Sequence, residues 1–372
     1  MEAHGDELAS LESLNCGKPL SAARNDEIPA IADVYRFFSG AIRNLMGSLS
    51  GEYLPGHTSM IRRDPLGVVA SIAPWNYPLM MAAWKLGPAI AMGNTVVLKP
   101  SENTPLTTLR FGEILAGILP PGVVNIVCGR GDTVGAPLIR DPRIRVASLT
   151  GDVSTGSKIM EAAARGIKRT HLELGGNNGC LILDDADLDL VAAEVTRGRL
   201  MMNGQACSAS KRLIVHRSLH DQLATKLVAA VEAQRHGAAT DPESTVGPLI
   251  HAGAAKKVAG QVANARSQGA EIAAGTGEAD GAYFPPTLLA GVPFDADIAR
   301  DARMVRVVTA MRGEIESDRQ SLLPGGDIAP VKGVGFLGGG EAGVLADGPR
   351  LRHVHRRVGP AQVGRDAGIG IE

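Results

Sequence analysis

The chain carries an apolar run that ends in a glycine pair, Thr170-His171-Leu172-Glu173-Leu174-Gly175-Gly176-Asn177-Asn178, and a later turn, Asn203-Gly204-Gln205-Ala206-Cys207-Ser208. The first segment has the pattern of a strand with a carboxylate near its end. The second places a thiol in a Gly/Asn-rich turn. A carboxylate can activate water and a thiolate can attack a carbonyl, so the pair predicts covalent catalysis followed by hydrolysis.

The Leu-Glu-Leu-Gly-Gly segment and the later Gly-Gln-Ala-Cys segment resemble the paired active-site signatures of the NAD(P)-dependent aldehyde dehydrogenases. The resemblance implies an α/β fold in which a Rossmann-type cofactor domain stands beside an α/β catalytic domain, with a projecting oligomerisation hairpin. It also implies that Cys207 is the nucleophile, that Glu173 is the general base, and that NAD is the cofactor for a small-molecule aldehyde substrate.

The bulk composition fits a two- or three-domain enzyme. The chain has 372 residues and a formal charge of -1, which argues against nucleic acid or an acidic membrane as the main partner. Its four cysteines lack CxxC or CxxH spacing, so neither a zinc site nor a disulfide framework is expected. With no signal peptide and no apolar run near 18 residues, we expect no membrane span and a cytoplasmic location.

The pattern along the chain predicts an open parallel sheet. Helical spacing over residues 6–46 is followed by a hairpin pattern around Pro55-Gly56 in residues 47–65. From Leu66 onward, apolar runs alternate with helical stretches, and the runs cover residues 67–73, 95–98, 123–127, 146–149 and 170–174. Ligands of such sheets bind beyond the carboxyl ends of the strands, so the residues just after each run are the candidates for function.

Pro74-Trp75-Asn76-Tyr77-Pro78 follows the first run. A carboxamide there can donate a hydrogen bond to an oxyanion, although an isolated Asn in a Pro-bounded turn more often serves the turn itself. The segment resembles the family's oxyanion motif, which implies that Asn76 stabilises the adduct on Cys207 and that Trp75 contacts the cofactor. Tyr77, Met81 and Trp84 share one helical face, which would be core packing by pattern alone and the aldehyde tunnel by resemblance.

Lys99 and Glu102 follow the second run. Lys99 can bond ribose hydroxyls, and Glu102 can accept from the adenosine 2'-hydroxyl while repelling a 2'-phosphate, which favours NAD over NADP. A surface ion pair is the alternative interpretation. The position after a strand and the resemblance favour the cofactor role.

Thr150-Gly151-Asp152-Val153-Ser154-Thr155-Gly156-Ser157-Lys158 follows the fourth run. It is neither GxGxxG nor a P-loop, but it resembles the family's pyrophosphate loop, with Gly151 and Gly156 at the matching glycines and Leu174 also near the cofactor. Asp152 stands where the family usually has a serine. A carboxylate beside two phosphates should weaken NAD binding unless it turns away or is neutralised.

The predicted domains are residues 1–46 and 66–174 for NAD binding, 47–65 for the hairpin, 175–300 for catalysis and 301–372 for an atypical tail. Cys180 is expected in packing. A helix beginning at Cys207 would favour its thiolate and supply a second oxyanion donor.

After about residue 300 the resemblance stops. The family's Glu-Glu-Ile-Phe-Gly-Pro motif is replaced by Ala299-Arg300-Asp301-Ala302-Arg303-Met304-Val305-Arg306, and the Gly- and Arg-rich remainder predicts a poorly ordered tail, which a shifted reading frame would explain. The start also looks short for the family. The resemblance implies that the hairpin helps to form a homo-oligomer, although the family's terminal pairing strand is not recognisable.

Residues 14–86 resemble the aminobutyraldehyde (aminoaldehyde) dehydrogenases, which implies 4-aminobutyraldehyde as the substrate. The later half is more similar to succinate-semialdehyde or broader enzymes. A catalytically inactive aldehyde dehydrogenase-like fragment is the second hypothesis, favoured by the missing nicotinamide motif. A P-loop nucleotide hydrolase, the third, rests only on residues 151–158.

Overall fold

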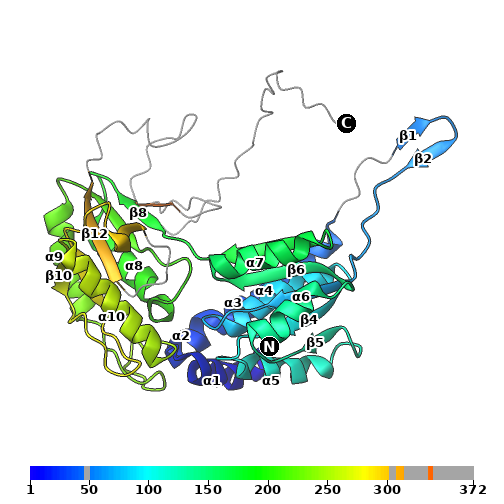
Figure 1. The fold of residues 1–372 in the computed structure, drawn as a ribbon, viewed down its shortest axis with the longest axis horizontal. Coiled ribbons are helices and arrows are strands. Elements are labelled where there is room, and N and C mark those ends of the chain that lie inside the picture. Colours follow the sequence, from blue (N-terminus) through cyan, green and yellow to red (C-terminus); the bar gives the residue numbers. More distant parts are fainter. Residues whose placement is uncertain (46–50, 301–306, 314–333, 338–372) are drawn as a thin grey trace.

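The computed structural model describes residues 1–45, 51–300, 307–313 and 334–337. Within these ranges the chain forms two sheets with their covering helices, and a short hairpin that stands away from both (Figure 1). The first part follows the predicted alternation of strands and helices.

The first sheet is parallel and has the strand order β5-β4-β3-β6-β7. Its strands are β3 (Val68–Ile72), β4 (Thr95–Lys99), β5 (Val124–Ile126), β6 (Ile144–Gly151) and β7 (Arg169–Leu174). The central strands are rich in Val, Ile, Leu and Ala because helices cover both faces of the sheet. β7 is an edge strand, which leaves polar side chains such as Glu173 exposed.

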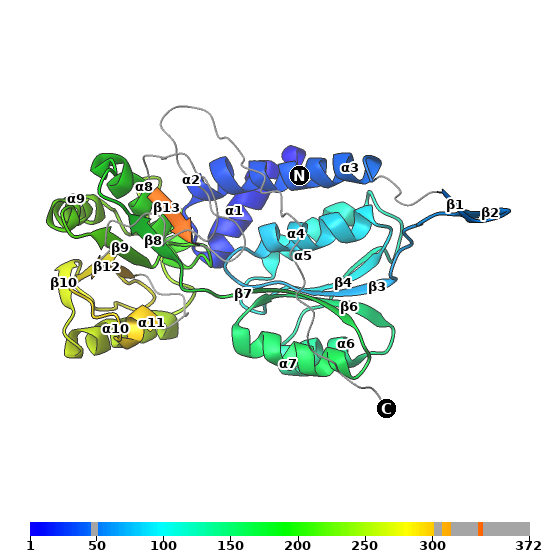
Figure 2. The same ribbon diagram turned by 90° about the horizontal axis from the view of Figure 1, so that it is seen from above.

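Helices pack on both faces of this sheet (Figure 2). One face carries α4 (Pro78–Ala91) and α5 (Leu106–Ala116), and the other carries α6 (Ala136–Arg140) and α7 (Val153–Ala164). α4 buries Leu79, Ala82, Ala83 and Leu86 against the strands, and Pro78 stands in its first turn, where a missing N–H costs nothing. α4 thus brings one polar residue, Lys85, down to the sheet.

The N-terminal helices lie outside α4 and α5 and also contact the part of the chain that carries the second sheet. They are η1 (Glu2–His4), α1 (Gly5–Cys16), α2 (Leu20–Ala22), the π-helical η2 (Ala23–Glu27) and α3 (Ile28–Arg43). The start of α2 contacts the second part of the chain, since Leu20 N donates to the Ala239 carbonyl at 3.0 Å. The predicted helical segment therefore joins the two parts of the chain.

The second sheet has the order β10-β11-β12-β9-β8-β13. Its elements are β8 (Gly179–Ile182), α8 (Leu188–Leu200), η4 (Met201–Gly204), β9 (Arg212–His216), α9 (His220–Glu232), α10 (Ala252–Ser267), β10 (Glu271–Ala274), β11 (Thr287–Ala290), α11 (Asp297–Arg300), β12 (Val307–Gly313) and β13 (Val334–Leu337).

Two of these strands come from the segment predicted to be a tail. β12 pairs in parallel with both β9 and β11, and β13 pairs antiparallel with β8. The boundary expected at residue 300 therefore does not coincide with the edge of this sheet. The other residues of the expected tail lie outside the described part of the chain.

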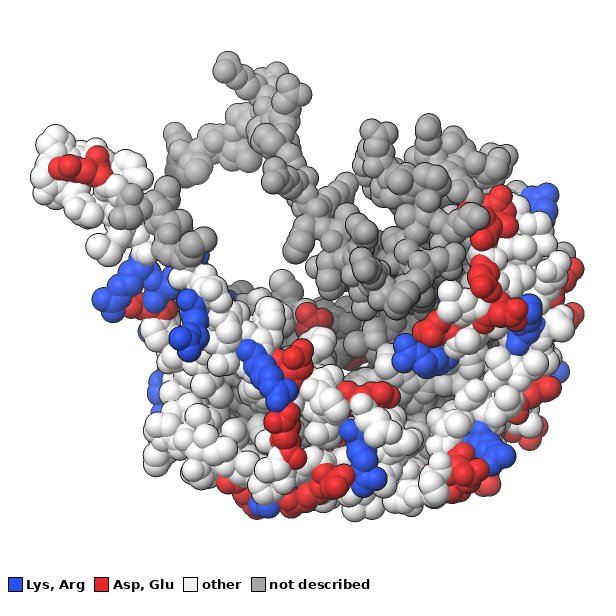
Figure 3. Space-filling view, turned by 180° about the vertical axis from the view of Figure 1, so that it is seen from behind, with Lys and Arg blue, Asp and Glu red and all other residues white. Residues whose placement is uncertain are grey.

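The hairpin consists of β1 (Gly51–Leu54) and β2 (His57–Ser59), which pair antiparallel around Pro55-Gly56 as predicted. Its side chains are exposed, including Tyr53 and Leu54. On the face shown in Figure 3, acidic and basic side chains are interspersed over the described residues. Among the described helices, none combines the length and apolar composition that a membrane crossing requires.

Candidate active site

Cys207 lies in a turn that is held by hydrogen bonds from both sides. The preceding η4 contains two non-glycine residues with left-handed backbone, Met202 (φ 50°) and Asn203 (φ 56°). The fully buried Arg199 guanidinium donates to the Gly204 carbonyl at 2.7 Å, and Asn203 Nδ2 donates to the Gly17 carbonyl at 2.7 Å. Asn tolerates this conformation better than branched residues. The turn is therefore fixed before it reaches the thiol.

The helix expected to begin at Cys207 is absent from the described structure, because residues 205–209 form turns and the next regular element is β9. The prediction of a helix dipole at the thiol is corrected accordingly. Asn178 engages both groups that the first helical hydrogen bond would use, because its Nδ2 donates to the Cys207 carbonyl at 3.1 Å and its carbonyl accepts from Lys211 N at 3.0 Å.

The four thiols differ in burial. Burial raises the pKa of Cys16 and of Cys180 to about 12, so both stay protonated at neutral pH, and Cys180 packs in the core as expected. Cys128 and Cys207 are exposed. Because only a thiolate is a good nucleophile, the two buried cysteines are poor candidates.

Asn76 brings the end of β3 to the cysteine loop. Its side chain is buried, and its Nδ2 donates to the Gln205 carbonyl at 2.7 Å, two residues before Cys207. In the connection from β7 to β8, Asn178 Nδ2 donates to the Cys207 carbonyl itself at 3.1 Å. Asn76, Cys207 and the segment after Glu173 therefore meet between the two sheets.

The predicted tunnel residues do not share one environment. Tyr77 packs against the cysteine loop beside Met202 and Ala206, and the Lys18 ammonium lies 4.3 Å from the centre of its ring. Met81 is buried in the hydrophobic core that α4 forms with the first sheet. Trp84 is half exposed and lines a cavity of about 910 Å³ that also includes Glu173.

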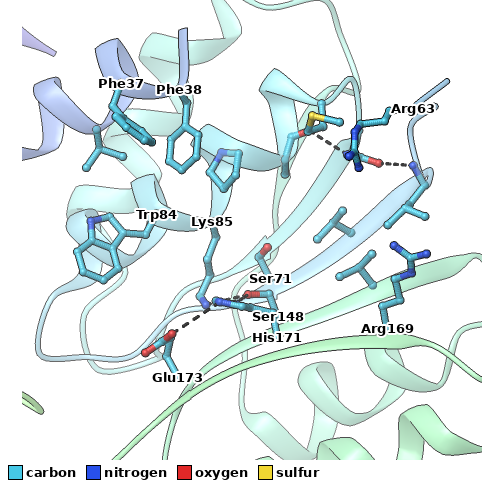
Figure 4. A pocket seen from close by; sticks show the side chains of 18 of the residues that line it. Phe37, Phe38, Arg63, Ser71, Trp84, Lys85, Ser148, Arg169, His171 and Glu173 are labelled. Carbon is cyan, nitrogen blue, oxygen red and sulfur yellow. Dashed lines mark hydrogen bonds and ion pairs between the residues drawn. The ribbon is translucent and has the colours of Figure 1, made fainter. Parts of the chain in front are cut away.

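Glu173 has polar neighbours that the sequence analysis did not single out. Its Oε1 lies 3.7 Å from His171 Nε2, His171 Nδ1 lies 3.3 Å from Ser148 Oγ, and Lys85 Nζ donates to Ser148 Oγ at 3.0 Å (Figure 4). Burial lowers the pKa of Lys85 to about 8, against the opposing attraction of Glu173. A lysine within an otherwise apolar helix was the available sequence signal.

Lys99 and Glu102 stand at the carboxyl end of β4 as a pair. Lys99 Nζ is buried, donates to the Pro100 carbonyl at 3.0 Å and lies 3.3 Å from Glu102 Oε2. Desolvation acts to raise the pKa of Glu102, but a bond from its own backbone N–H and the Lys99 ammonium outweigh it, so the pKa is lowered. Glu102 thus stays ionised, ready to accept from a hydroxyl.

At the end of β6, Asp152 caps α7. Its carboxylate accepts from Ser154 N at 2.8 Å, so it is directed at the helix N-terminus. Gly151 ends β6, paired with Leu174, and a β-carbon on Gly156 would lie 2.9 Å from Leu174 Cδ2. Gly156 therefore permits close packing of α7 on β7. Trp75 is half-buried on the loop between β3 and α4.

These groups fit a dinucleotide in part. The polar residues after β3, β4, β6 and β7 share the carboxyl edge of one parallel sheet, where such cofactors bind. The Asp152 carboxylate, in contrast, occupies a backbone amide that a phosphate would use. No group of three His, Cys, Asp or Glu side chains suited to a metal ion occurs in the described ranges.

The family model described as "Aldehyde dehydrogenase family" matches residues 1–317. Betaine aldehyde dehydrogenase of Cereibacter sphaeroides is 38% identical over 325 residues, which cover 86% of this chain and 66% of that protein. Aminoaldehyde dehydrogenase 2, peroxisomal, of Pisum sativum is 39% identical over 303 residues, which cover 79% of this chain and 60% of that protein.

The fold is also that of a solved relative. The NAD+ complex of an aldehyde dehydrogenase from Bacillus cereus superposes with a TM-score of 0.82 at 35% identity, covering 86% of this chain and 65% of that one. The chain thus spans about two thirds of the length of these relatives. From the matched residues and the shared fold, the chain belongs to the aldehyde dehydrogenase family.

Proposed function

We propose that this chain oxidises an aldehyde to a carboxylic acid with NAD, through a thiohemiacetal and a thioester on Cys207. The observation that carries the proposal is the meeting of Asn76, Asn178 and the Cys207 loop, joined by hydrogen bonds of 2.7 and 3.1 Å. An exposed thiol, a carboxamide and a carboxylate on the adjoining strand are the groups that this chemistry needs.

The chain's own residues have distinct parts in the reaction. The Cys207 thiolate forms a C–S bond to the aldehyde carbon, and the Asn76 amide, with the Cys207 backbone N–H, stabilises the resulting alkoxide. NAD, when bound, supplies the acceptor for the hydride. Glu173 then removes a proton from water, whose oxygen bonds to the thioester carbon, and the C–S bond breaks to restore the thiolate.

Lys99, Glu102, Gly151, Gly156, Trp75 and Leu174 are the proposed contacts to NAD. The buried Lys99 and the ionised Glu102 support contacts to ribose hydroxyls, and the negative charge of Glu102 disfavours a 2'-phosphate.

The proposed substrate is 4-aminobutyraldehyde or a related aminoaldehyde. The resemblance of residues 14–86 supports it, as do the relatives named for betaine aldehyde and for aminoaldehydes. Both substrate types carry a positively charged nitrogen. Succinate semialdehyde, which is an anion at neutral pH, is the alternative substrate to test beside them.

The test is formation of NADH with an aldehyde panel. Substitution Cys207→Ala should abolish oxidation and leave NAD binding intact, whereas Cys128→Ala, at the other exposed cysteine, should leave the rate unchanged. Glu173→Gln should preserve a first turnover of NADH and slow the steady rate.

Turnover by Cys207→Ala would refute the nucleophile. If NAD binds but the wild-type chain forms no NADH with any aldehyde, the second candidate, an inactive member of the family, is correct. The observation that favours this candidate is the lack of a Glu-Glu-Ile-Phe-Gly-Pro segment after residue 299.

A further inference from the structure

A row of polar side chains crosses the first sheet beneath α4. Register pairs Ser71 on β3 with Ser148 on β6, and Ser148 with His171 on β7, so the three residues share one face. Ser71 and Ser148 are buried, whereas His171 stands at the exposed edge with 63% of its side chain accessible. The row connects the interior of the sheet to the edge that carries Glu173.

Two ionisable groups contact this row, Lys85 at Ser148 and Glu173 at His171. Lys85 descends from α4 to Ser148 with an Nζ–Oγ distance of 3.0 Å, and Ser148 Oγ lies 3.3 Å from His171 Nδ1. His171 Nε2 faces Glu173 Oε1 at 3.7 Å, because residues two apart on a strand point to the same side (Figure 4). The side chains thus form one chain of contacts from Lys85 to Glu173.

The two ring nitrogens of His171 have different charged neighbours. Lys85 acts from α4 on the Nδ1 side, and Glu173 acts from β7 on the Nε2 side. Arg169 on β7, Arg63 and Asp33 line the same cavity, and Arg62 is paired with Asp64 at 2.9 Å. Among the described residues, Glu173 is the carboxylate that lies within 4 Å of the His171 ring nitrogens.

We propose that His171 is a positioning residue that holds Glu173 and takes up the proton that Glu173 removes from water; this inference rests on the proposed function. In each cycle the proton on the Glu173 carboxyl moves to His171 Nε2, and the imidazolium releases its Nδ1 proton to solvent, which the exposed ring can reach. Glu173 returns to the carboxylate and the ring to its neutral form.

Glu173 needs a proton acceptor in each cycle, and the exposed position of the two side chains lets His171 reach it. A general base must lose its proton before the next water is activated. His171 Nε2 and Glu173 Oε1 lie 3.7 Å apart, and because 63% of the His171 side chain and 53% of the Glu173 side chain is exposed, rotation of either can shorten the distance to that of a hydrogen bond.

The experiment uses p-nitrophenyl acetate, an ester that acylates a thiol without NAD, in parallel with 4-aminobutyraldehyde and NAD. The release of nitrophenolate separates acylation of Cys207, seen as a burst, from deacylation through Glu173, seen as the steady rate. Variants His171→Ala and His171→Gln are compared with Arg169→Gln, which changes the same strand and face of the same cavity.

We expect both His171 variants to keep the burst amplitude and to lose about tenfold or more in the steady rate. Imidazole added to His171→Ala should restore part of that rate with saturation, because the site opens to the cavity. Arg169→Gln should retain both phases. A structural role alone would not yield rescue by imidazole.

A steady rate for His171→Ala within about twofold of wild type, a parallel loss of burst and steady rate, or the absence of rescue would each overturn the inference. If the wild type hydrolyses the ester but forms no NADH, the oxidation proposed above fails while the role of His171 is still decided. If the wild type releases nitrophenolate no faster than Cys207→Ala does, Cys207 is not acylated and both proposals fall.

Discussion

Asp152 sets the charge at the proposed pyrophosphate position. Its carboxylate accepts from Ser154 N at 2.8 Å and so occupies the N-terminus of α7 with negative charge. A phosphate brought there meets both the charge and an amide already in use. Asp152 is therefore the residue that departs most clearly from a cofactor-binding loop.

Substitution Asp152→Asn keeps an oxygen that can cap the helix but removes the charge. We expect the dissociation constant for NAD to fall by about threefold to tenfold, since one repulsion of about 1 kcal/mol is removed. Calorimetric titration with NAD measures it. Asp152→Ala, which also loses the cap, should be less stable by about 1 kcal/mol. Unchanged affinity in Asp152→Asn would show that the carboxylate does not face the cofactor.

Lys85 gives the protein a distinct pH dependence of stability. Burial lowers its pKa from 10.5 to about 8, so between these values the unfolded chain binds more protons than the folded one. The contribution of Lys85 to stability therefore rises with pH through this interval, and its full cost is present below pH 8.

Lys85→Met should accordingly stabilise the fold at neutral pH by about 2 kcal/mol after loss of the Ser148 hydrogen bond is subtracted. The advantage should vanish as the pH approaches 10.5. Urea unfolding of both proteins from pH 7 to 10 tests this, and parallel curves for the two proteins over that range would contradict the buried ammonium.

At the scale of elements, α7 and β7 approach closely enough to require glycine. A β-carbon on Gly156 would lie 2.9 Å from Leu174 Cδ2 and 3.0 Å from Cδ1. Leu174 follows Glu173 directly, so displacement of α7 also shifts the proposed general base.

Gly156→Ala should cost about 1–3 kcal/mol by overpacking and slow the steady rate of deacylation. The matched control is Gly260→Ala on α10, where an added β-carbon meets nothing within 4 Å. There the substitution should stabilise by about 0.5–1 kcal/mol through helix propensity. Thermal unfolding compares them, and equal effects of the two substitutions would contradict the packing argument.

The strands of the first sheet were predictable because each falls in a short segment with apolar residues that is bounded by turn residues. The run at residues 95–98 became β4, Thr95–Lys99, and the run at 170–174 became β7, Arg169–Leu174. The positions of β12 and β13 were not predictable, since they depend on pairing with strands that lie far away in the sequence.

At the site, the Asn76–Gln205 contact followed from neither periodicity nor spacing, because it joins residues 129 positions apart. The association of Asn76 with the Cys207 segment came instead from the family resemblance. Ser148 and His171 were missed because a polar residue in a strand shows its purpose only when its register partner is known. The same limit explains the helix wrongly expected at Cys207.

For the whole molecule, the loop after α1 is the joint between the two sheets. Lys18 there is buried between Glu12 and Glu27, with which it forms ion pairs. Breaking such a buried pair is costly, so the loop is rigid. Across it, a β-carbon on Gly247 would lie 2.1 Å from the Gly17 carbonyl oxygen, which shows how closely the two parts approach.

Asn203 connects the loop after α1 to the second part of the chain by hydrogen bonds. Its Nδ2 donates to the Gly17 carbonyl at 2.7 Å and to the Pro248 carbonyl at 2.9 Å, and its Oδ1 accepts from Gly247 N at 2.6 Å. Because the residue is fully buried with φ 56°, its substitution removes several hydrogen bonds and leaves a strained alanine.

Asn203→Ala should therefore cost about 3–5 kcal/mol and let the two parts unfold separately. The two tryptophans, Trp75 and Trp84, both lie in the first part, so their fluorescence reports on it alone, whereas far-UV circular dichroism reports on both. In wild type the two denaturation curves should coincide, and in Asn203→Ala they should diverge.

Asn264→Ala, which removes an exposed hydrogen bond to Asp297, is the matched control and should leave the curves coincident. Coincident curves with an unchanged midpoint in Asn203→Ala would mean that the joint is held elsewhere, and the cysteine turn would then owe its position to Asn76, Asn178 and Arg199.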